Sequence, residues 1–134
     1  CTGGMLDSRL TYISGSSMYI KGSIVTYSNE AKMKFLDVDK EILDTKGSVS
    51  PEVAKQMAEG VRKAVGSDIG VGITGIAGPT GGTDKKPVGL VYIAVAGKDN
   101  TVVKENIFSG DRARVRYRST QQALEMIRQY IKNK

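Results

Sequence analysis

The stretch Val88-Gly-Leu-Val-Tyr-Ile-Ala-Val-Ala96 is apolar along nearly its whole length. A run of this kind, bounded by turn residues, is typical of a strand buried at the centre of a sheet. The tetrapeptide Gly97-Lys-Asp-Asn100 follows and predicts a hairpin turn. We therefore expect Thr101–Phe108 to form the antiparallel partner of the apolar strand.

Helical patterns lie on both sides of this hairpin. Ser50-Pro51 opens the clearest helix, because serine is a favoured N-cap and proline fits the first helical position, and Gly66 ends it. Apolar residues recur every four positions between these limits, so one face of the helix is expected to pack on a core. Further helices are predicted over Gly4–Ile13, Asn29–Leu36, Asp39–Lys46 and from Asp111 to the C-terminus.

Two more strands are predicted before the hairpin. Ser23–Ser28 is rich in β-branched residues, and Asp68–Thr74 has a buried-strand pattern with two glycines. The alternation of helices and strands indicates the α/β class, as a layered α/β/α sandwich with a mixed sheet. A chain of 134 residues has the size of one domain, so residues 1–134 are assigned to a single domain.

The amino-acid composition excludes several kinds of active site. The chain contains no histidine and a single cysteine, Cys1. It therefore cannot build a Ser-His-Asp triad, a Cys-His pair, a His-ligated zinc site or an internal disulfide. Any general base must be Lys, Tyr, Asp, Glu or an external group. No signal peptide pattern and no apolar run of membrane length are present, which predicts a cytoplasmic protein with no membrane partner.

The formal net charge of +6 suits an anionic partner. The densest basic stretch places Arg112, Arg114, Arg116 and Arg118 at alternate positions, which point to different sides of a helix. The favoured interpretation is a solvated helix start, and one arginine that reaches a phosphate is the next. Nucleic acid is an unfavoured partner, because aromatic residues are only 6% of the chain and no nucleic-acid-binding motif is found.

Two glycine-containing segments have the residue types of an anion site. Cys1-Thr2-Gly3-Gly4 precedes a predicted helix, where backbone amides can bind an anion, although glycine is equally ordinary at a helix start. Thr74–Gly82 follows a predicted strand, and such a loop can present backbone donors to a phosphate or an oxyanion. The alternative for this second segment is a simple connection, but the small residues of Thr74–Pro79 favour a function.

A third segment contains a candidate base. In the absence of histidine, a lysine with a lowered pKa is the natural base for a serine nucleophile, and Lys32 beside Ser16 or Ser17 would meet this requirement. Tyr27 would relay a proton or hold the substrate. The alternative is that Lys32 is an ordinary solvated surface lysine.

Seven blocks of the sequence, taken together, resemble the CinA C-terminal domain family, whose characterised members are nicotinamide mononucleotide (NMN) deamidases. The resemblance covers essentially the whole chain. The matching blocks, in order, are Cys-Thr-Gly-Gly at 1–4, Gly-Ser-Ser at 15–17, Val-Thr-Tyr-Ser-Asn-Glu-Ala-Lys at 25–32, Gly-Ser-Val-Ser at 47–50, Thr-Gly-Ile-Ala-Gly-Pro at 74–79, Lys-Pro-Val-Gly at 86–89 and Gly-Asp-Arg at 110–112.

The resemblance implies an amidohydrolase that converts NMN to nicotinic acid mononucleotide and ammonia in bacterial pyridine-nucleotide salvage. It implies an α/β sandwich fold, no cofactor, no metal, and a homo-oligomer, most simply a dimer. Ser17, Lys32 and Tyr27 are the catalytic residues that it assigns. The expected substrate-binding residues are Thr2, Gly3, Gly4, Ser16, Thr74, Gly75, Ala77, Gly78 and Arg114.

One departure from the family pattern concerns the start of the chain. The family has Glu-Ser directly before the block that matches residues 1–4, with a helix and a strand before that. We therefore expect a domain without its N-terminal helix and strand. The alternative function, suggested by the basic charge and the link of the family to competence, is a non-catalytic module that binds a nucleotide or DNA.

Overall fold

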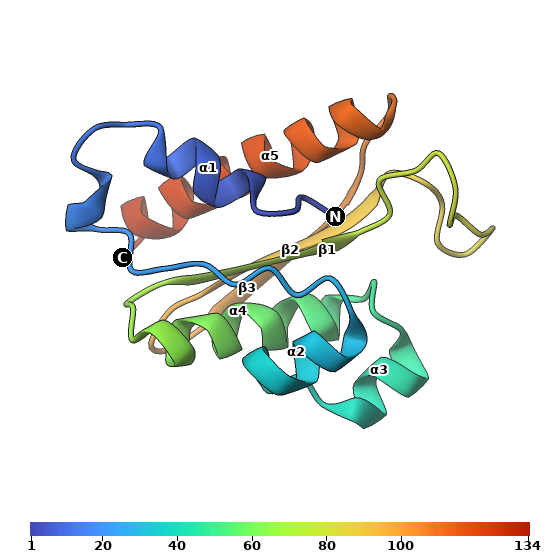
Figure 1. The fold of residues 1–134 in the computed structure, drawn as a ribbon, viewed down its shortest axis with the longest axis horizontal. Helices are drawn as coiled ribbons and strands as arrows, with labels where there is room; N and C mark the ends of the chain where they lie inside the picture. Colours follow the sequence, from blue (N-terminus) through green and yellow to red (C-terminus); the bar gives the residue numbers. More distant parts are fainter.

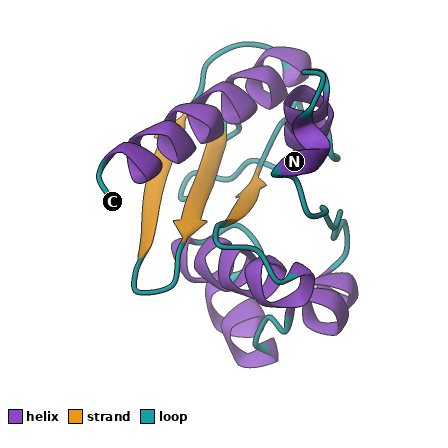
Figure 2. Ribbon diagram, turned by 90° about the vertical axis from the view of Figure 1, so that its left-hand side faces the viewer, coloured by secondary structure: helices purple, strands orange, loops and turns teal.

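The computed structural model describes all residues from 1 to 134. A sheet lies between two helical layers, with α1 and α5 on one face and α4, backed by α2 and α3, on the other (Figures 1 and 2). The elements in chain order are α1 (Met5–Thr11), the 3-10 turn η1 (Ser16–Met18), α2 (Asn29–Leu36), α3 (Lys40–Lys46), α4 (Pro51–Val65), β1 (Gly70–Gly75), β2 (Leu90–Ala96), β3 (Thr101–Ile107) and α5 (Arg112–Lys132).

The sheet has the order β1-β2-β3 and is antiparallel throughout. Gly70 pairs with Ala96, and Ala96 pairs with Thr101 across the hairpin. The α/β class and the central position of β2 are confirmed, but the expected mixed sheet is wrong. The strand expected over Ser23–Ser28 does not form, because this extended segment has no strand beside it to pair with.

The two faces of the sheet pack differently. On the α5 face, branched side chains of β2, including Ile93, pack against Val115, Ala123 and Met126. On the α4 face the contact is made by small residues, with Ala54 and Ala58 against the alanines of β2. A small-residue contact lets helix and strand backbones approach closely. The sheet therefore lies nearer to α4, and the larger apolar core lies on the α5 side.

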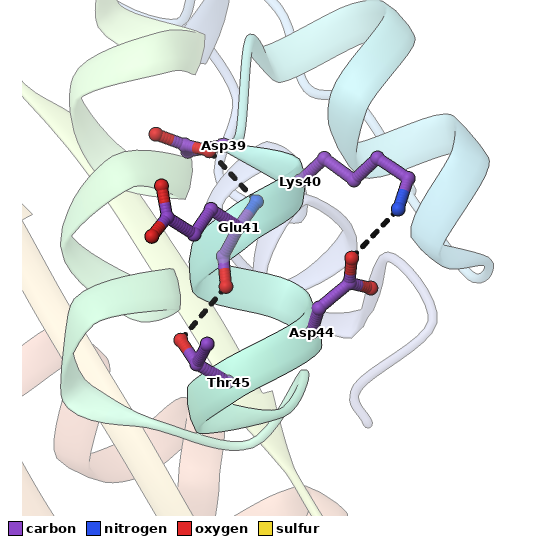
Figure 3. Close-up of polar contacts among 5 residues, drawn as sticks. All are labelled: Asp39, Lys40, Glu41, Asp44 and Thr45. Atoms are coloured by element: carbon purple, nitrogen blue, oxygen red, sulfur yellow. Dashed lines mark hydrogen bonds and ion pairs between the residues drawn. The ribbon is translucent and has the colours of Figure 1, made fainter.

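Side-chain caps at the first turns fix where the helices begin. Ser50 Oγ accepts a hydrogen bond from Val53 N at 3.3 Å, and Asp111 Oδ1 accepts one from Arg114 N at 2.9 Å. In α3, Asp39 caps the Glu41 amide at 2.8 Å (Figure 3). The helices predicted from the sequence are all present, and their limits differ from the prediction by a few residues at most.

Two polar contacts lie within α3 itself. Lys40 Nζ forms an ion pair with Asp44 at 2.6 Å, and the Thr45 hydroxyl donates to the Glu41 carbonyl oxygen at 2.7 Å (Figure 3). These exposed contacts stabilise one helix weakly and lie away from the cavities described below. Across the whole fold, each helix is too short or too polar to cross a bilayer.

Candidate active site

A polar cavity of about 270 Å³ lies where β1 ends and α2 begins. Its walls come from the extended segment before α2, the first turn of α2, the segment before α4, the end of β1 with the loop that follows it, and the first turn of α5, together with Cys1 and Met57. Its volume lies just under the roughly 300 Å³ at which ordinary small-molecule pockets begin. The side chains that matter for its chemistry come from Thr26, Tyr27, Lys32, Ser48, Thr74 and Arg112.

Lys32 is the chemically unusual residue of this cavity. The Ser28 hydroxyl caps α2 by accepting from Ala31 N at 3.1 Å, and Lys32 follows in the same turn. Lys32 as a whole residue is only 6% exposed, and its Nζ donates a single hydrogen bond, to the Thr26 carbonyl oxygen at 2.9 Å. Neither ion pair of the structure involves Lys32. Burial therefore lowers the pKa of Lys32 below its ordinary value of 10.5.

The loop after β1 brings free backbone donors to the cavity. Ile76 N donates to the Leu90 carbonyl oxygen at 2.9 Å, which joins the start of the loop to β2. The next two amides, of Ala77 and Gly78, are buried and donate to no group of the chain. Two adjacent buried N–H groups of this kind can bind an anion or a developing oxyanion.

Arg112 connects α5 to this loop. Its Nη1 donates to the Gly78 carbonyl oxygen at 2.8 Å, and its guanidinium retains further donors for a ligand. Arg112 and Lys32 are the two basic side chains at the cavity wall, and no Asp or Glu lines it. The electrostatics therefore favour an anionic ligand.

Thr74 has a structural role that the sequence does not reveal. Its hydroxyl donates to the Ser48 carbonyl oxygen at 2.6 Å, which ties the end of β1 to the segment before α4. Thr74 is buried, so this bond brings Ser48 and Thr74 together at one wall of the cavity.

The structure brings together half of the residues predicted for the site. Lys32, Tyr27, Thr74, Gly75, Ala77 and Gly78 all line the polar cavity. Tyr27 is exposed at its mouth. The residues that do not line it are Ser16, Ser17, Thr2, Gly3, Gly4 and Arg114.

Ser17 is not brought to Lys32. It lies in η1, where its side chain is exposed, and this turn stands beyond the far end of α1, away from α2 (Figure 1). Ser16, in the same turn, is buried. The expected Ser-Lys pair is therefore not formed within this structure.

The predicted residues near the start of the chain and Arg114 have other surroundings. Thr2, Gly3 and Gly4 line a neighbouring, mainly apolar cavity, which shares Thr26, Tyr27 and Ile73 with the polar one. The Thr2 carbonyl oxygen accepts a hydrogen bond from Arg116 at 2.9 Å. Arg114 is exposed and packs its side-chain stem near Gly110. Arg112 lines the cavity instead. It is the last residue of the Gly-Asp-Arg block, so choosing it rather than Arg114 was possible from the sequence.

Comparison with known proteins agrees with this architecture. The model of the family described as "CinA C-terminal domain" matches residues 1–131. This chain belongs to the CinA C-terminal domain family. A CinA-like protein from Koribacter versatilis is 55% identical over 131 residues, covering 98% of this chain and 32% of that protein. A CinA-like protein from Syntrophomonas wolfei is 51% identical, covering 99% of this chain and 32% of its own length.

Solved structures show the same fold. A competence/damage inducible protein from Agrobacterium tumefaciens superposes with a TM-score of 0.93 at 41% identity, covering 95% of this chain and 78% of that one. A CinA superfamily protein from Escherichia coli gives a TM-score of 0.93 at 34% identity, covering 97% and 76%. This CinA domain spans about a third of the length of the curated relatives that it matches.

Proposed function

We propose that the polar cavity binds NMN and hydrolyses its carboxamide, giving nicotinic acid mononucleotide and ammonia. The observation that carries the proposal is the Lys32 amine, which is buried without an acidic partner at the cavity wall. A lysine with a lowered pKa is a competent base at a pH where an ordinary lysine remains protonated. Membership of the CinA family agrees with this proposal.

The charge of the cavity supports a phosphorylated substrate. Lys32 and Arg112 line it without any carboxylate, so an incoming phosphate meets attraction and no like-charge repulsion. The free amides of Ala77 and Gly78 are the donors that we assign to the amide oxygen as it becomes an oxyanion. Tyr27, at the mouth, would contact the substrate from the solvent side.

In the proposed reaction, neutral Lys32 removes a proton from a nucleophile, which then attacks the carboxamide carbon. A new carbon–oxygen bond forms and the carbonyl oxygen becomes an oxyanion. When the carbonyl reforms, the carbon–nitrogen bond breaks and the amine takes a proton from the Lys32 ammonium, leaving as ammonia. With water as the nucleophile, NMN and water give the acid and ammonia directly.

The family resemblance assigns the nucleophile to Ser17, which would add an acyl-enzyme step that water later hydrolyses. Because Ser17 lies outside the Lys32 cavity, we expect Ser17→Ala to retain most of its NMN deamidation, as direct attack by water predicts. Loss of activity in a folded Ser17→Ala protein would reinstate the covalent route.

The deciding measurement is ammonia release from NMN, run beside nicotinamide and glutamine. Ammonia from NMN alone is expected, because nicotinamide and glutamine lack the phosphate. Lys32→Met should abolish release, whereas Lys55→Met should not, because Lys55 is an exposed lysine of α4 outside the cavity. Binding of NMN without any ammonia release would refute the enzyme and favour a nucleotide-binding module.

A further inference from the structure

Two segments that border the polar cavity lie far apart in the sequence. Ser48 and Val49 belong to the connection between α3 and α4, and Ala77 and Gly78 belong to the loop after β1. No backbone–backbone hydrogen bond joins the connection to the loop. Side-chain contacts must therefore set the distance between these two walls of the cavity.

Two side chains join the walls, one at each end of the loop. Thr74, just before the loop, donates to the Ser48 carbonyl oxygen as described above. Lys86, near the end of the loop, donates from Nζ to the Lys46 carbonyl oxygen at 2.5 Å. No backbone amide donates to either carbonyl oxygen. Lys46 is the last residue of α3, and a lysine side chain is a common partner for the last carbonyl groups of a helix.

The backbone around Lys86 directs its side chain. The Lys86 amide donates to Thr83 Oγ1 at 3.0 Å, and the Lys86 carbonyl oxygen accepts from Thr83 N at 2.7 Å. With both backbone groups bonded, the side chain starts from a fixed position. It ends against Gly47, where an added Cβ would lie 2.9 Å from the Lys86 Nζ. Gly47 therefore leaves the space that the ammonium group occupies.

The same part of the loop supports one of the two free backbone donors. An added Cβ at Gly78 or at Gly82 would overlap Val88, so the beginning and the end of the loop pack against one another there. Val88 follows Lys86 by two residues. A displacement of Lys86 from the end of α3 would therefore move the residue that packs against Gly78, and with it the Gly78 amide.

Lys86 does not belong to the cavity wall itself. It is half-buried and does not line the cavity, and its ammonium group contacts the end of α3 instead. The neighbouring Lys85 is exposed and also lies outside the cavity. The influence of Lys86 on a ligand is therefore indirect, through the two walls that it joins.

We propose that Lys86 is a positioning residue, whose bond to Lys46 holds the Ala77 and Gly78 amides in the place where they bind the oxyanion. The inference rests on the proposed function for the role of these amides. Donors that are fixed in advance stabilise the transition state, and a small misplacement of them is costly. Loss of the Lys86 contact should therefore lower kcat and leave KM nearly unchanged.

The kinetic test compares three lysine variants in NMN deamidation. Lys86→Met keeps an apolar stem but removes the donor, and it should lower kcat by about tenfold or more while KM changes by less than about threefold. Lys85→Met removes the same charge one residue away and should retain both constants. Lys86→Arg keeps a charged N–H donor and should recover most of the lost kcat.

A nuclear magnetic resonance measurement tests the position of the amides without any reaction. In the amide proton–nitrogen correlation spectrum of the 134-residue protein, Lys86→Met should shift or broaden the Ala77 and Gly78 resonances, whereas Lys85→Met should leave them in place. If the unmodified protein released no ammonia from NMN, the proposed function alone would be refuted, and the spectra would still decide the role of Lys86.

Three outcomes would overturn the proposal. The first is that the Ala77 and Gly78 resonances of folded Lys86→Met match those of the unmodified protein. The second is that KM rises while kcat is retained, since Lys86 would then contribute to ligand binding and not to the placement of the donors. The third is that Lys86→Met does not fold, because Lys86 would then serve the stability of the whole domain.

Discussion

The Nζ of Lys32 and the carbonyl oxygen of Thr26 are joined by a hydrogen bond of 2.9 Å. The bond ties the first turn of α2 to the extended segment before it, and it uses one hydrogen of the amine. A neutral amine can donate this bond and keep its lone pair for a proton of the substrate or of water. The contact therefore orients the Lys32 amine without placing a carboxylate beside it that would favour its protonated form.

The pKa of Lys32 makes stability depend on pH. Because the folded pKa lies below the ordinary 10.5, the unfolded chain binds more protons between these two values. The free energy of unfolding should therefore rise with pH across that window, and fall as the pH is lowered through the folded pKa. Lys32→Met should remove this slope, as measured by urea denaturation at a series of pH values.

Other groups titrate in the same range, so the difference between variants is the informative quantity. Lys55→Met, at an exposed lysine, should reproduce the pH dependence of the unmodified protein. Equal slopes in the Lys32→Met and unmodified proteins would show that burial of Lys32 does not disfavour its charge.

Arg112 and Arg114 should differ sharply in their effect on NMN deamidation. Arg112 lines the polar cavity and holds the Gly78 carbonyl at 2.8 Å, whereas Arg114 is exposed outside it. Arg112→Ala should raise KM by about tenfold or more, since a charge-assisted contact contributes roughly 1.5–3 kcal/mol. Arg114→Ala should change KM little. A larger effect at Arg114 would place the phosphate outside this cavity.

Gly72 lies where β1 closely approaches α4. A Cβ added there would overlap the Ala54 carbonyl oxygen of α4. Gly72→Ala should therefore lower the free energy of unfolding by about 1–3 kcal/mol through overpacking. The matched control is Gly22→Ala, because a Cβ at Gly22 has its nearest neighbour at 3.4 Å, an ordinary contact with Val65. Equal thermal stability of both variants would contradict the close approach.

Tyr130 fastens the end of α5 to the hairpin. Its hydroxyl donates to Asn100 Oδ1 at 2.6 Å, in the turn between β2 and β3. Tyr130→Phe should lower the free energy of unfolding by about 0.5–1.5 kcal/mol, which denaturant titration can measure. Tyr12→Phe should cost nothing detectable, since Tyr12 is 87% exposed. Equal free energies of unfolding for the two variants would contradict a stabilising role of the Tyr130–Asn100 hydrogen bond.

Local signals in the sequence predict most of the fold. The Ser50 cap, the apolar run of β2 and the turn before β3 each act within a few residues, and all appear where expected. The segment Ser23–Ser28 has the composition of a strand, but a strand also needs a neighbour to pair with. That requirement is non-local, and the composition of the segment carries no information about it.

The candidate site was predictable to the extent that its residues adjoin the ends of helices and strands. Lys32 lies in a helix predicted from the sequence, and Ala77 and Gly78 follow a predicted strand; all three line the polar cavity. Ser17 was not placed correctly beside Lys32, because the path of the chain between η1 and α2 decides that distance. Arg114 was chosen instead of Arg112, although Arg112 is the residue that belongs to the Gly-Asp-Arg block; residues two apart at a helix start lie on different sides, and only Arg112 lines the cavity.

The glycines of β1 also constrain how the molecule can move. Gly70 and Gly72 bring the strand against the backbone of α4, so no side chain lies between them that could change rotamer and absorb a displacement. We therefore expect α4 and β1 to move together as one rigid unit. Access of a ligand to the polar cavity should then depend on parts outside this contact, chiefly the exposed stretch from Pro79 to Lys85. Cross-linking that stretch should slow ligand exchange, whereas stiffening α4 further should leave it unchanged.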